Sequence, residues 1–291
     1  MTLEQLRLFV AVAEREHMTR AAAALHRTQS AVSAAIAGLE AQSGVTLFHR
    51  VGRRIVLTEE GRAFLIEARA VVAQADAAER ALADLAGMKR GLLSVMASQT
   101  IASYWLPPKL VAFRAAHPQV AVKALIGNTA EVAAAVAEGH AEIGLVEGKV
   151  ADPMLEQTLV GHDRLVIVAG AAHPWTTKPP SPADLLKERW VLREKGSGTR
   201  SAFEAAIAEK GVDLSKLNIS LELPSNEAVR LAVRDGAGVS ALSELVAEAG
   251  IQFGALAPVK FPLPERAFHA LRHRERYLSK SGAAFLESVQ I

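Results

Sequence analysis

The sequence contains no cysteine and no long apolar run, and each absence excludes a class of protein. Without cysteine there is no disulfide framework, no thiol redox sensor and no cysteine-ligated metal. No segment approaches the roughly 20 apolar residues that cross a bilayer. The opening run, MTLEQLRLFVAVAERE, carries acidic residues and no basic leader, unlike a signal peptide. We therefore expect a cytoplasmic protein without a membrane partner.

A strong charge imbalance is also lacking, because the 291 residues carry a net charge of only +2. A surface that binds nucleic acid must therefore be local. At roughly 150 residues per domain, the length predicts about two domains. Half of the residues are hydrophobic, which is enough to give each domain a core.

Catalytic motifs are missing as well. The chain has no G-x-S-x-G elbow, no H-E-x-x-H and no dinucleotide fingerprint. His269 and His273 stand four apart, but their segment is a predicted strand flanked by Arg, which argues against a metal site. We predict that the protein is not an enzyme and holds no metal and no cofactor other than a small effector.

Residues 19–44 contain two short helical patterns separated by a polar turn at 26–28. Thr19 is a candidate N-cap for the first helix, residues 20–25. The second, residues 29–42, repeats apolar side chains at spacings of four and three: Val32, Ile36 and Leu39. Its opposite face is small and polar, as in a helix that enters a DNA groove. The pattern predicts a helix-turn-helix, and an ordinary helical hairpin is the alternative.

A basic hairpin follows, with its strands near residues 45–48 and 55–58, where a wing would lie beside the recognition helix. Residues 1–57 contain seven Arg and four Glu. Three of these Arg stand at the hairpin tip: Arg50, Arg53 and Arg54. Contacts from such side chains to phosphates would set the position on DNA without reading its sequence.

These residues resemble a known family. The runs LEQLRLFVAVAERE, TRAAAALHRTQSAVSAAIAGLE and GVTLFHR, and the LTEEG at 57–61, are similar to the winged helix-turn-helix of LysR-type transcriptional regulators. The resemblance implies double-stranded operator DNA as partner, with RNA polymerase as a further one. The residues implied to contact DNA are Thr28, Gln29, Ser30, Ser33, Arg50, Arg53 and Arg54. Ser30 is often Pro in the family, and Ala34 and Ala35 replace longer polar side chains, so no base contact is assigned to these two alanines.

Residues 58–88 read as one long helix with a heptad seam. The seam positions are Phe64, Ala68, Val71, Ala75, Ala78, Leu82 and Leu85. Such a seam favours a homodimer, which would present two recognition helices to a two-fold-symmetric operator. A helix lying on its own domain is the alternative. Gly87 and Gly91, around Lys89 and Arg90, mark a hinge.

From Gly91 onward short strands alternate with helices, which predicts α/β units and a largely parallel sheet. The predicted strands are 92–98, 120–126, 142–146, 165–169, 190–192, 219–223 and 238–242, and the predicted helices are 105–116, 130–138, 200–210, 227–234 and 280–289. The units form two sets, with a crossing at Gly161 and a crossing back at 266–272. Two lobes joined in this way resemble the periplasmic-binding-protein fold, which is the effector domain of LysR-type regulators.

Three parts are therefore expected. They are a winged helix-turn-helix (1–58), a linker and dimerisation helix (59–90) and an effector-binding domain (91–291), with lobe 1 at 91–161 and 266–291 and lobe 2 at 162–265. Tetramers are common in the family, so a homodimer or homotetramer is expected.

Four predicted strands end in hydroxyl or amide side chains, at the edge where an open parallel sheet binds ligands. These are Ser98, Gln99 and Thr100; Asn128 and Thr129; Ser197, Gly198, Thr199 and Arg200; and Ser225 and Asn226. Any one group could be a simple N-cap, but four groups, two per lobe, favour a cleft. Glu147 either accepts a bond from the ligand or fixes its loop, and Arg193, Lys195 or Arg200 would add charge. Because the set is rich in donors, we expect a small anionic effector.

The effector half is similar to one LysR subgroup. ASQTIASYWLPPKLVAFRAAHPQVAVKALIGNT, GLVEG, WVLREKGSGTR and RYLSKSGAAFL resemble the CysL/YeiE-like regulators, which implies sulfur metabolism and sulfite as effector. Regulators of carbon fixation share several of these motifs, so sulfite, sulfate and a phosphorylated metabolite all stay open. A solute-binding protein would share the two lobes without the DNA-binding head, and a DNA-architectural protein would lack the large second domain.

Overall fold

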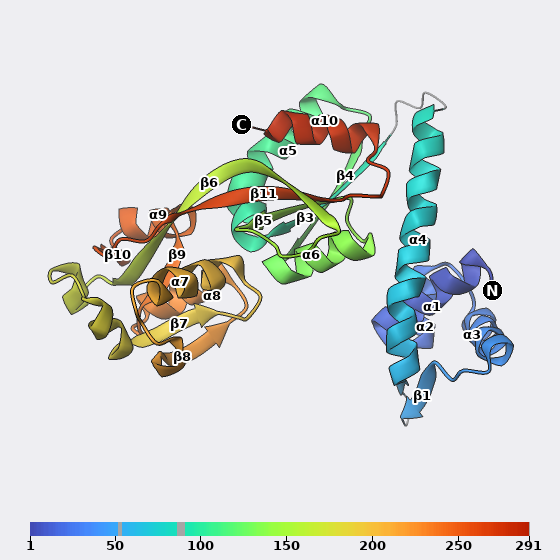
Figure 1. The fold of residues 1–291 in the computed structure, drawn as a ribbon, viewed down its shortest axis with the longest axis horizontal. Helices are drawn as coiled ribbons and strands as arrows, with labels where there is room; N and C mark the ends of the chain where they lie inside the picture. Colours follow the sequence, from blue (N-terminus) through green and yellow to red (C-terminus); the bar gives the residue numbers. More distant parts are fainter. Residues whose placement is uncertain (52–53, 86–90, 291) are drawn as a thin grey trace. The chain divides into compact units, whose positions relative to one another are not determined.

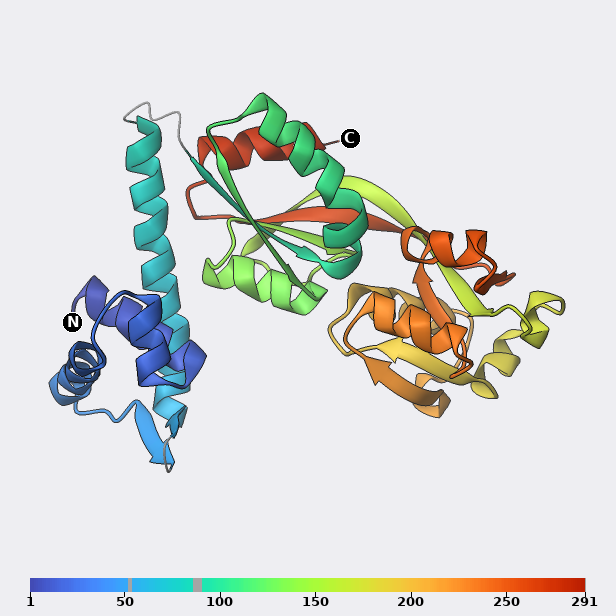
Figure 2. The ribbon, with the colours of Figure 1, turned by 180° about the vertical axis from the view of Figure 1, so that it is seen from behind.

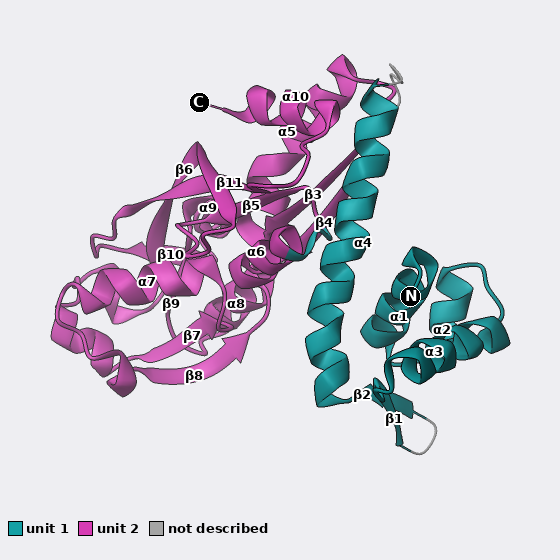
Figure 3. Cartoon of the chain, turned by 45° about the vertical axis from the view of Figure 1, so that its right-hand side comes forward, with its two compact units in different colours: residues 1–87, 138–140 teal, residues 88–137, 141–291 magenta. Residues whose placement is uncertain are grey.

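The computed structural model describes residues 1–51, 54–85 and 91–290. The chain separates into two compact units, residues 1–87 with 138–140 and residues 88–137 with 141–291 (Figure 3). We refer to them as the N-terminal and C-terminal units and describe each by itself. Among the described residues, no helix combines the length and apolar character needed to cross a membrane.

The N-terminal unit consists of four helices and a two-stranded wing (Figure 1). Its elements are α1 (Leu3–Arg15), α2 (Met18–Ala24), α3 (Gln29–Ser43), β1 (Phe48–Val51), β2 (Arg54–Leu57) and α4 (Glu59–Leu85). The two strands pair antiparallel. This is the winged helix-turn-helix that the sequence predicts, followed by the long helix.

One apolar cluster holds this unit together. The ring of Phe9 is fully buried and lies 5.4 Å from the ring of Phe48 and 4.9 Å from that of Phe64. The predicted apolar stripe of α3 faces the same cluster: Val32, Ile36 and Leu39 are buried. Burying such a side chain stabilises the fold by about 1.5–3 kcal/mol. The opposite face of α3 is therefore left to the solvent.

The predicted start of the first helix of the motif was wrong. Helix α2 begins at Met18, and its N-cap is His17 rather than Thr19, because the His17 ring accepts the N–H of Arg20. The second helix starts where expected, with Thr28 as its N-cap. Between the helices His26 has a φ of +53°, a conformation that residues other than glycine rarely adopt. The turn is therefore tight.

The first half of the α4 seam packs on its own domain, and the second half is exposed, so each of the two predicted alternatives holds for part of the helix. Phe64 and Ala68 pack into the N-terminal core, as in a helix that lies on its own domain. Val71, Leu82 and Leu85 are exposed by 48%, 67% and 82%. The second half of the seam is therefore the part that a partner helix could cover. Of the predicted hinge, Gly87, Lys89 and Arg90 lie outside the described residues.

The C-terminal unit contains a seven-stranded sheet with the order β10-β6-β11-β5-β3-β4, and β9 pairs with β6. The strands are β3 (Leu92–Ser98), β4 (Ala121–Gly127), β5 (Ile143–Glu147), β6 (Leu155–Gly170), β9 (Ser240–Ser243), β10 (Leu256–Val259) and β11 (Glu265–His273). Strand β3 runs parallel to β4 and β5, whereas β6, β9, β10 and β11 pair antiparallel. A separate parallel pair is formed by β7 (Arg189–Arg193) and β8 (Asn218–Leu223). The expected parallel sheet is thus limited to the strands that end at the predicted cleft.

Helices cover the sheet and end the unit. They are α5 (Leu106–Ala116), α6 (Thr129–Glu138), α7 (Gly198–Ala208), α8 (Asn226–Arg234), α9 (Glu244–Gln252) and α10 (Lys280–Val289), with short 3-10 turns η2 (Pro174–Thr176), η3 (Pro182–Leu186) and η4 (Leu214–Lys216). In the first lobe α5 and α10 share one apolar cluster with β3 and β5, and α6 belongs to another. Helix α9 was not predicted.

Two long strands, β6 and β11, join the lobes (Figure 1). Figure 2 shows the same two strands side by side from behind. The predicted strand at 165–169 is confirmed in place but is too short, because it is the second half of β6, a single strand of 16 residues that runs through Gly161. Its pairing with β11 skips Val160, between the partners of Phe268 and His269. Such a bulge increases local twist. The connection between the lobes is therefore a twisted, hydrogen-bonded ribbon and not a pair of loops.

Helix α5 is entered through a π-helical turn, η1 (Ile101–Trp105). Pro107 and Pro108 follow in the first turn of α5 and have no N–H to donate. The N–H of Leu106 donates instead to the carbonyl of Ile101, five residues earlier. A widened turn therefore lies between the predicted cleft residues 98–100 and the two prolines.

Candidate functional sites

The outer face of α3 carries the predicted DNA-contacting side chains. Gln29 and Ser30 are exposed, and Ser33 is half-buried. The Thr28 hydroxyl accepts the N–H of Ala31 at 3.2 Å and lies 3.2 Å from the Ser30 hydroxyl. Thr28 is therefore a cap, although its own hydroxyl proton can still be donated. The structure brings these four residues together at the first turn of α3.

The wing is fixed to α3 by a residue that the sequence analysis missed. Glu40 is the one acidic residue of α3, and its Oε1 accepts the N–H groups of Leu47 at 2.7 Å and Phe48 at 3.1 Å. A carboxylate that accepts two backbone N–H groups makes charge-assisted hydrogen bonds. The wing therefore has a defined position beside the recognition helix. In the sequence, the signal for this role was a single acidic residue in an otherwise uncharged helix.

The LTEEG motif joins the wing to α4. The Thr58 hydroxyl donates to the carbonyl of Thr46 at 2.9 Å and accepts the N–H of Gly61 at 2.8 Å. A Cβ on Gly61 would lie 2.2 Å from the carbonyl oxygen of Leu47. Only glycine allows this close approach of helix and wing. The motif thus has a structural role in positioning the wing.

The structure describes two of the three Arg predicted at the tip of the wing. Arg50 and Arg54 are both exposed on the wing strands, whereas Arg53 lies outside the described residues. Arg50 pairs with Ile55 and Val51 with Arg54 in the antiparallel register. The two Arg are therefore close along the hairpin and available to solvent.

In the C-terminal unit the four predicted groups meet between the lobes. Asn226, at the start of α8, is fully buried and links them. Its N–H donates to Gln99 Oε1 at 2.6 Å, its Nδ2 donates to Thr100 Oγ1 at 3.1 Å, and its Oδ1 accepts from Arg193 Nη1 at 2.7 Å. The backbone N–H and both polar atoms of the side chain are thus bonded within the protein. Asn226 therefore holds the two lobes together at the start of α8.

The GSGTR stretch makes the second contact between the lobes. The carbonyl of Gly196, whose φ is +90°, accepts the N–H of Ala130 at 3.2 Å. A Cβ on Gly198 would lie 2.5 Å from Thr129 Oγ1 and 2.9 Å from Glu147 Oε2. The first turn of α7 is thus pressed against residues of the first lobe. This close approach is why glycine stands at position 198.

Several predicted residues serve the fold. Asn128 and Glu131 form a reciprocal cap at the start of α6. The Ser225 hydroxyl caps α8 by accepting the N–H of Ala228. Arg200 is buried and donates to Glu204 at 2.7 Å and to Glu222 at 2.5 Å. Burial alone would lower the pKa of Arg200, but these carboxylates raise it. The N-cap alternative is therefore right for Asn128 and Ser225, and the Arg200 guanidinium is already paired.

The predicted positive charge of Arg193 is also neutralised. Its Nε and Nη2 both bond the Glu194 carboxylate at 2.8 Å. Burial would raise the pKa of Glu194, but the bonds from Arg193 and Asn128 outweigh it and hold that pKa below its usual range. Lys195 is exposed. At the rim, the Tyr104 hydroxyl donates to Glu227 at 3.2 Å, and burial together with Glu227 raises the Tyr104 pKa.

Two hydroxyls of the predicted set are uncommitted. Ser98 is 2% exposed, and its Oγ has no hydrogen-bond partner among the described residues. Ser197 is equally buried, and its side chain does not cap α7. A buried hydroxyl without a partner costs about 1–3 kcal/mol. A buried donor without a partner, such as Ser98, and a hydroxyl at the start of α7, such as Ser197, are both suited to an anion.

Arg266 was predicted only as part of a crossing strand, and it contacts Thr199, one of the predicted cleft residues. Its Nε and Nη2 bond Asp163 Oδ2 at 2.8 and 2.5 Å, and its Nη1 donates to Thr199 Oγ1 at 3.1 Å. Asp163 also accepts from the Ser243 hydroxyl at 2.8 Å. Arg266 thus connects the crossing ribbon to the start of α7. An Arg at an inward position of an apolar strand was the signal in the sequence.

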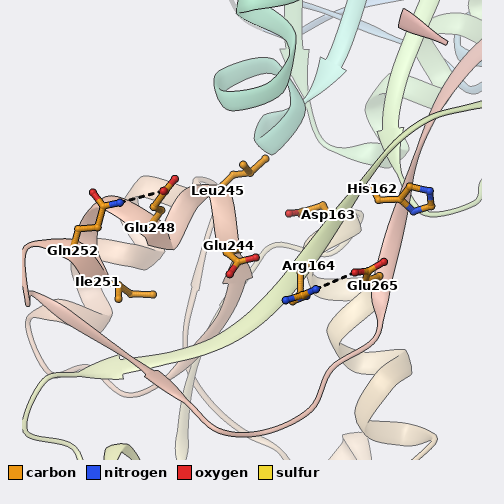
Figure 4. Close-up of a pocket in the computed structure, with 9 residues that line it drawn as sticks. All are labelled: His162, Asp163, Arg164, Glu244, Leu245, Glu248, Ile251, Gln252 and Glu265. Carbon is orange, nitrogen blue, oxygen red and sulfur yellow. Dashed lines mark hydrogen bonds and ion pairs between the residues drawn. The ribbon is translucent and has the colours of Figure 1, made fainter. Parts of the chain in front are cut away.

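A groove of about 520 Å³ lies where the crossing strands meet α9 (Figure 4). Within it Arg164 donates to Glu265 at 3.1 Å, and the Gln252 amide donates to Glu248 at 3.1 Å. Asp163 is the one residue that it shares with the Arg266 network. Among the described residues, no group of three acidic, His or Cys side chains is placed to hold a metal ion. The groove therefore shares only Asp163 with the contacts between the predicted cleft residues.

Comparison with known families covers nearly the whole chain. Residues 3–62 match the bacterial regulatory helix-turn-helix proteins of the lysR family, and residues 86–290 match the LysR substrate binding domain. The uncharacterized HTH-type transcriptional regulator YeiE of Escherichia coli K12 is 36% identical over 295 residues, covering 99% of this chain and 96% of that protein. A probable RuBisCO transcriptional regulator of Guillardia theta is 32% identical and covers 99% and 95%.

Solved structures with the same fold include full-length and partial regulators. Full-length CbnR, complexed with its target DNA, is 25% identical, with a TM-score of 0.68 and 99% of each chain covered. The regulatory domain of CcmR from Synechocystis PCC6803, in complex with 2-PG, is 27% identical, with a TM-score of 0.62 over 69% of this chain and 96% of that one. The predicted architecture, a DNA-binding head with a two-lobed domain, is confirmed.

Proposed function

Because this chain belongs to the LysR family of DNA-binding transcriptional regulators, we propose that a small anion held between its lobes controls how its N-terminal unit binds operator DNA. The observation that carries the proposal is the meeting of the four predicted groups between the lobes, with the buried Ser98 hydroxyl left without a partner. As a regulator of operator DNA, it is expected to act in the cytoplasm.

The DNA-contacting residues that we propose are those at the start of α3 and on the wing. Support comes from the exposure of Gln29, Ser30, Arg50 and Arg54 and from the fixed position of the wing. The full set is Thr28, Gln29, Ser30, Ser33, Arg50, Arg53 and Arg54. Gln and Ser can bond base edges, whereas the Arg side chains suit phosphates.

For the effector we propose sulfite or a related sulfur oxyanion. The donors that could still bond a ligand are the hydroxyls of Ser98, Ser197 and Thr199 and the first N–H groups of α7, beginning at Gly198. We propose that the remaining predicted residues surround this site and hold the lobes together: Gln99, Thr100, Asn128, Thr129, Glu147, Arg200, Ser225 and Asn226. Similarity to YeiE favours the sulfur-responsive subgroup.

The second candidate is a phosphorylated metabolite in a regulator of carbon fixation. Probable RuBisCO regulators are among the relatives, and the CcmR regulatory domain is solved with 2-PG. A phosphoryl group offers the same donors a similar oxyanion. The two candidates therefore differ in the part of the cleft outside the oxyanion site.

The mechanism that we propose is a population shift. An anion that binds one arrangement of the lobes better than another changes the balance between them by its differential affinity. Copies would associate through the exposed second half of the α4 seam, from Val71 to Leu85, and a tetramer would form through further surfaces. A change in lobe arrangement would then alter the spacing of the recognition helices on the operator.

A gel-shift titration tests the proposal. The DNA upstream of the divergently oriented neighbouring gene should be bound specifically, and sulfite should change the affinity or the mobility of the complex. Thr199→Ala should weaken this response while DNA binding persists, because Thr199 lies in the cleft. Lys187→Ala, at an exposed ion pair with Asp184, is the control and should respond like the wild type. Binding that ignores sulfite and responds to a phosphorylated acid would favour the second candidate.

A further inference from the structure

A second cavity of the C-terminal unit, of about 550 Å³, lies along α5 and receives residues from η1, α9 and α10. None of the described residues that line it belongs to the predicted cleft set. The side chains that decide its chemistry are Tyr104, Trp105, Lys109, Phe113, His117 and Leu245. We refer to it as the α5 pocket. Its size is within the range of small-molecule sites, roughly 300–1,000 Å³.

Rings form much of the wall of the α5 pocket. The buried Phe113 ring lies 4.6 Å from the His117 ring, measured between centroids, at an angle of 37°. Tyr104 and Trp105, at the end of η1, add two further rings. Aromatic groups pack favourably on other rings, either offset-stacked or edge-to-face. The wall is therefore suited to a flat aromatic ligand.

One cation of the α5 pocket has no acidic partner. Lys109 is half-buried, and its Nζ lies 4.3 Å from the centroid of the Trp105 ring. Among the described residues no carboxylate pairs with Lys109, and no acidic residue lines the pocket. A carboxylate that enters would gain a charge-assisted bond to this ammonium group. The pocket thus complements an aromatic ring that carries one negative charge.

Leu245 connects the α5 pocket to the second lobe. It lies at the start of α9 (Figure 4) and packs against the apolar core of the first lobe. Its N–H donates to the Ser243 hydroxyl at 3.1 Å, and that hydroxyl donates to Asp163 Oδ1 at 2.8 Å. Asp163 is the ion-pair partner of Arg266, which bonds Thr199 of the cleft. A ligand that displaces Leu245 therefore acts on the contacts between the lobes.

We propose that the α5 pocket is a second regulatory site, which binds an aromatic carboxylate and thereby changes the affinity of the cleft for its effector. The ring lies among Trp105, Phe113 and His117, and the carboxylate lies at Lys109. Coupling between two sites is reciprocal, so the effector changes the affinity for the aromatic acid by the same factor. The binding of the acid is independent of the proposed function, whereas the coupling rests on it.

Calorimetric titration of the full chain with phenylacetate, 2-phenylethanol and acetate tests the site. Phenylacetate should bind at least about tenfold tighter than 2-phenylethanol, which lacks the charge, and than acetate, which lacks the ring. Lys109→Met keeps the apolar stem and should bind phenylacetate as weakly as the alcohol. Lys123→Met, at an exposed position of β4, is the matched control and should bind it like the wild type. Equal wild-type affinities for phenylacetate and either analogue would overturn the proposal.

A blocking variant locates the bound acid. Ala112 is exposed and lines the α5 pocket, so Ala112→Phe fills the space that the ring needs. We expect at least about tenfold weaker binding of phenylacetate. Val111→Phe, on the same helix and outside the pocket, should leave this binding unchanged, because Val111 is 71% exposed. Binding that is lost in Thr199→Ala and kept in Ala112→Phe would place the acid in the cleft and refute the second site.

Titration with sulfite in saturating phenylacetate measures the coupling. The sulfite affinity should change by about fivefold or more, and Ala112→Phe should bind sulfite without showing this change. An unchanged sulfite affinity would overturn the regulatory role of the α5 pocket. If sulfite itself does not bind, the proposed effector is wrong, and the operator affinity with and without phenylacetate decides the regulatory role instead.

Discussion

The two units of this regulator use their functional side chains in opposite ways. In the N-terminal unit Gln29 and Arg50 are exposed and available to an external partner. In the C-terminal unit Asn226 and Thr199 are buried and bonded to residues far away in the sequence. DNA is too large to be enclosed, so its binding surface stays open. A small effector can be enclosed, and the enclosing groups must hold one another in place.

The first test of this comparison is Arg266→Ala. Its ion pair with Asp163 is 5% and 1% exposed, and removing one partner leaves a buried charge uncompensated. We expect the C-terminal unit to lose about 4 kcal/mol of stability. All three Trp lie in that unit, so urea unfolding followed by Trp fluorescence measures it selectively. Arg164→Ala breaks a neighbouring pair that is 57% and 61% exposed and should cost less than about 1 kcal/mol. Equal losses would contradict the comparison.

The second test is Gly61→Ala in the N-terminal unit. The added methyl group would meet the Leu47 carbonyl at 2.2 Å, so the wing or α4 must shift. We expect about 3 kcal/mol of destabilisation and loss of DNA binding, measured by circular dichroism and gel shift, with unchanged Trp fluorescence. Gly38→Ala is the control, since the nearest atom is 3.8 Å away. It should stabilise α3 by about 0.5–1 kcal/mol. A stable Gly61 variant would mean that the wing contact is not obligatory.

The third test is Glu40→Gln. The amide oxygen can accept from Leu47 or Phe48, but the charge that strengthens both bonds is lost. We expect about 1 kcal/mol of destabilisation of the N-terminal unit. Thermal unfolding by circular dichroism measures this, and Glu60→Gln, at an exposed position of α4, is the matched control. No difference between the two variants would remove Glu40 from the wing anchor.

The smallest expected effect on stability belongs to Arg50→Ala combined with Arg54→Ala. Both side chains are exposed, so stability should change by less than about 0.5 kcal/mol. The slope of log affinity against log salt should fall by about 2, close to 0.9 per lost phosphate contact. Fluorescence anisotropy with labelled operator DNA at several salt concentrations measures it. An unchanged slope would place the phosphate contacts elsewhere.

Local sequence signals predicted helices and strands well where caps and a continuous apolar pattern define the element. The last helix was expected at 280–289 and forms as Lys280–Val289, because Ser279 caps it and its apolar face fits the lobe. The second half of β6 was predicted as the strand at 165–169. Its first half was missed because it is more polar, and there the pairing with β11 supplies what the local pattern lacks.

The sequence predicted which residues gather between the lobes, but not which of them bond one another. Strand ends show where polar groups gather, and the predicted residues do meet there. Which of them are used up depends on partners such as Gln99 and Asn226, 127 positions apart, or Asp163 and Arg266, 103 apart. Pairing over such distances leaves no mark in the local sequence pattern.

A tryptophan beside the bulge at Val160 can report on the ribbon that joins the lobes. The Trp105 indole lies edge-on to Phe268, with ring centroids 5.9 Å apart, and a Cβ on Gly161 would be 3.1 Å from its Nε1. Both neighbours flank the irregular point of the ribbon that joins the lobes. The other two Trp lie together in the second lobe, 6.3 Å apart. A variant that keeps Trp105 as its sole tryptophan would show rotation of the lobes as a change in emission, without any attached dye.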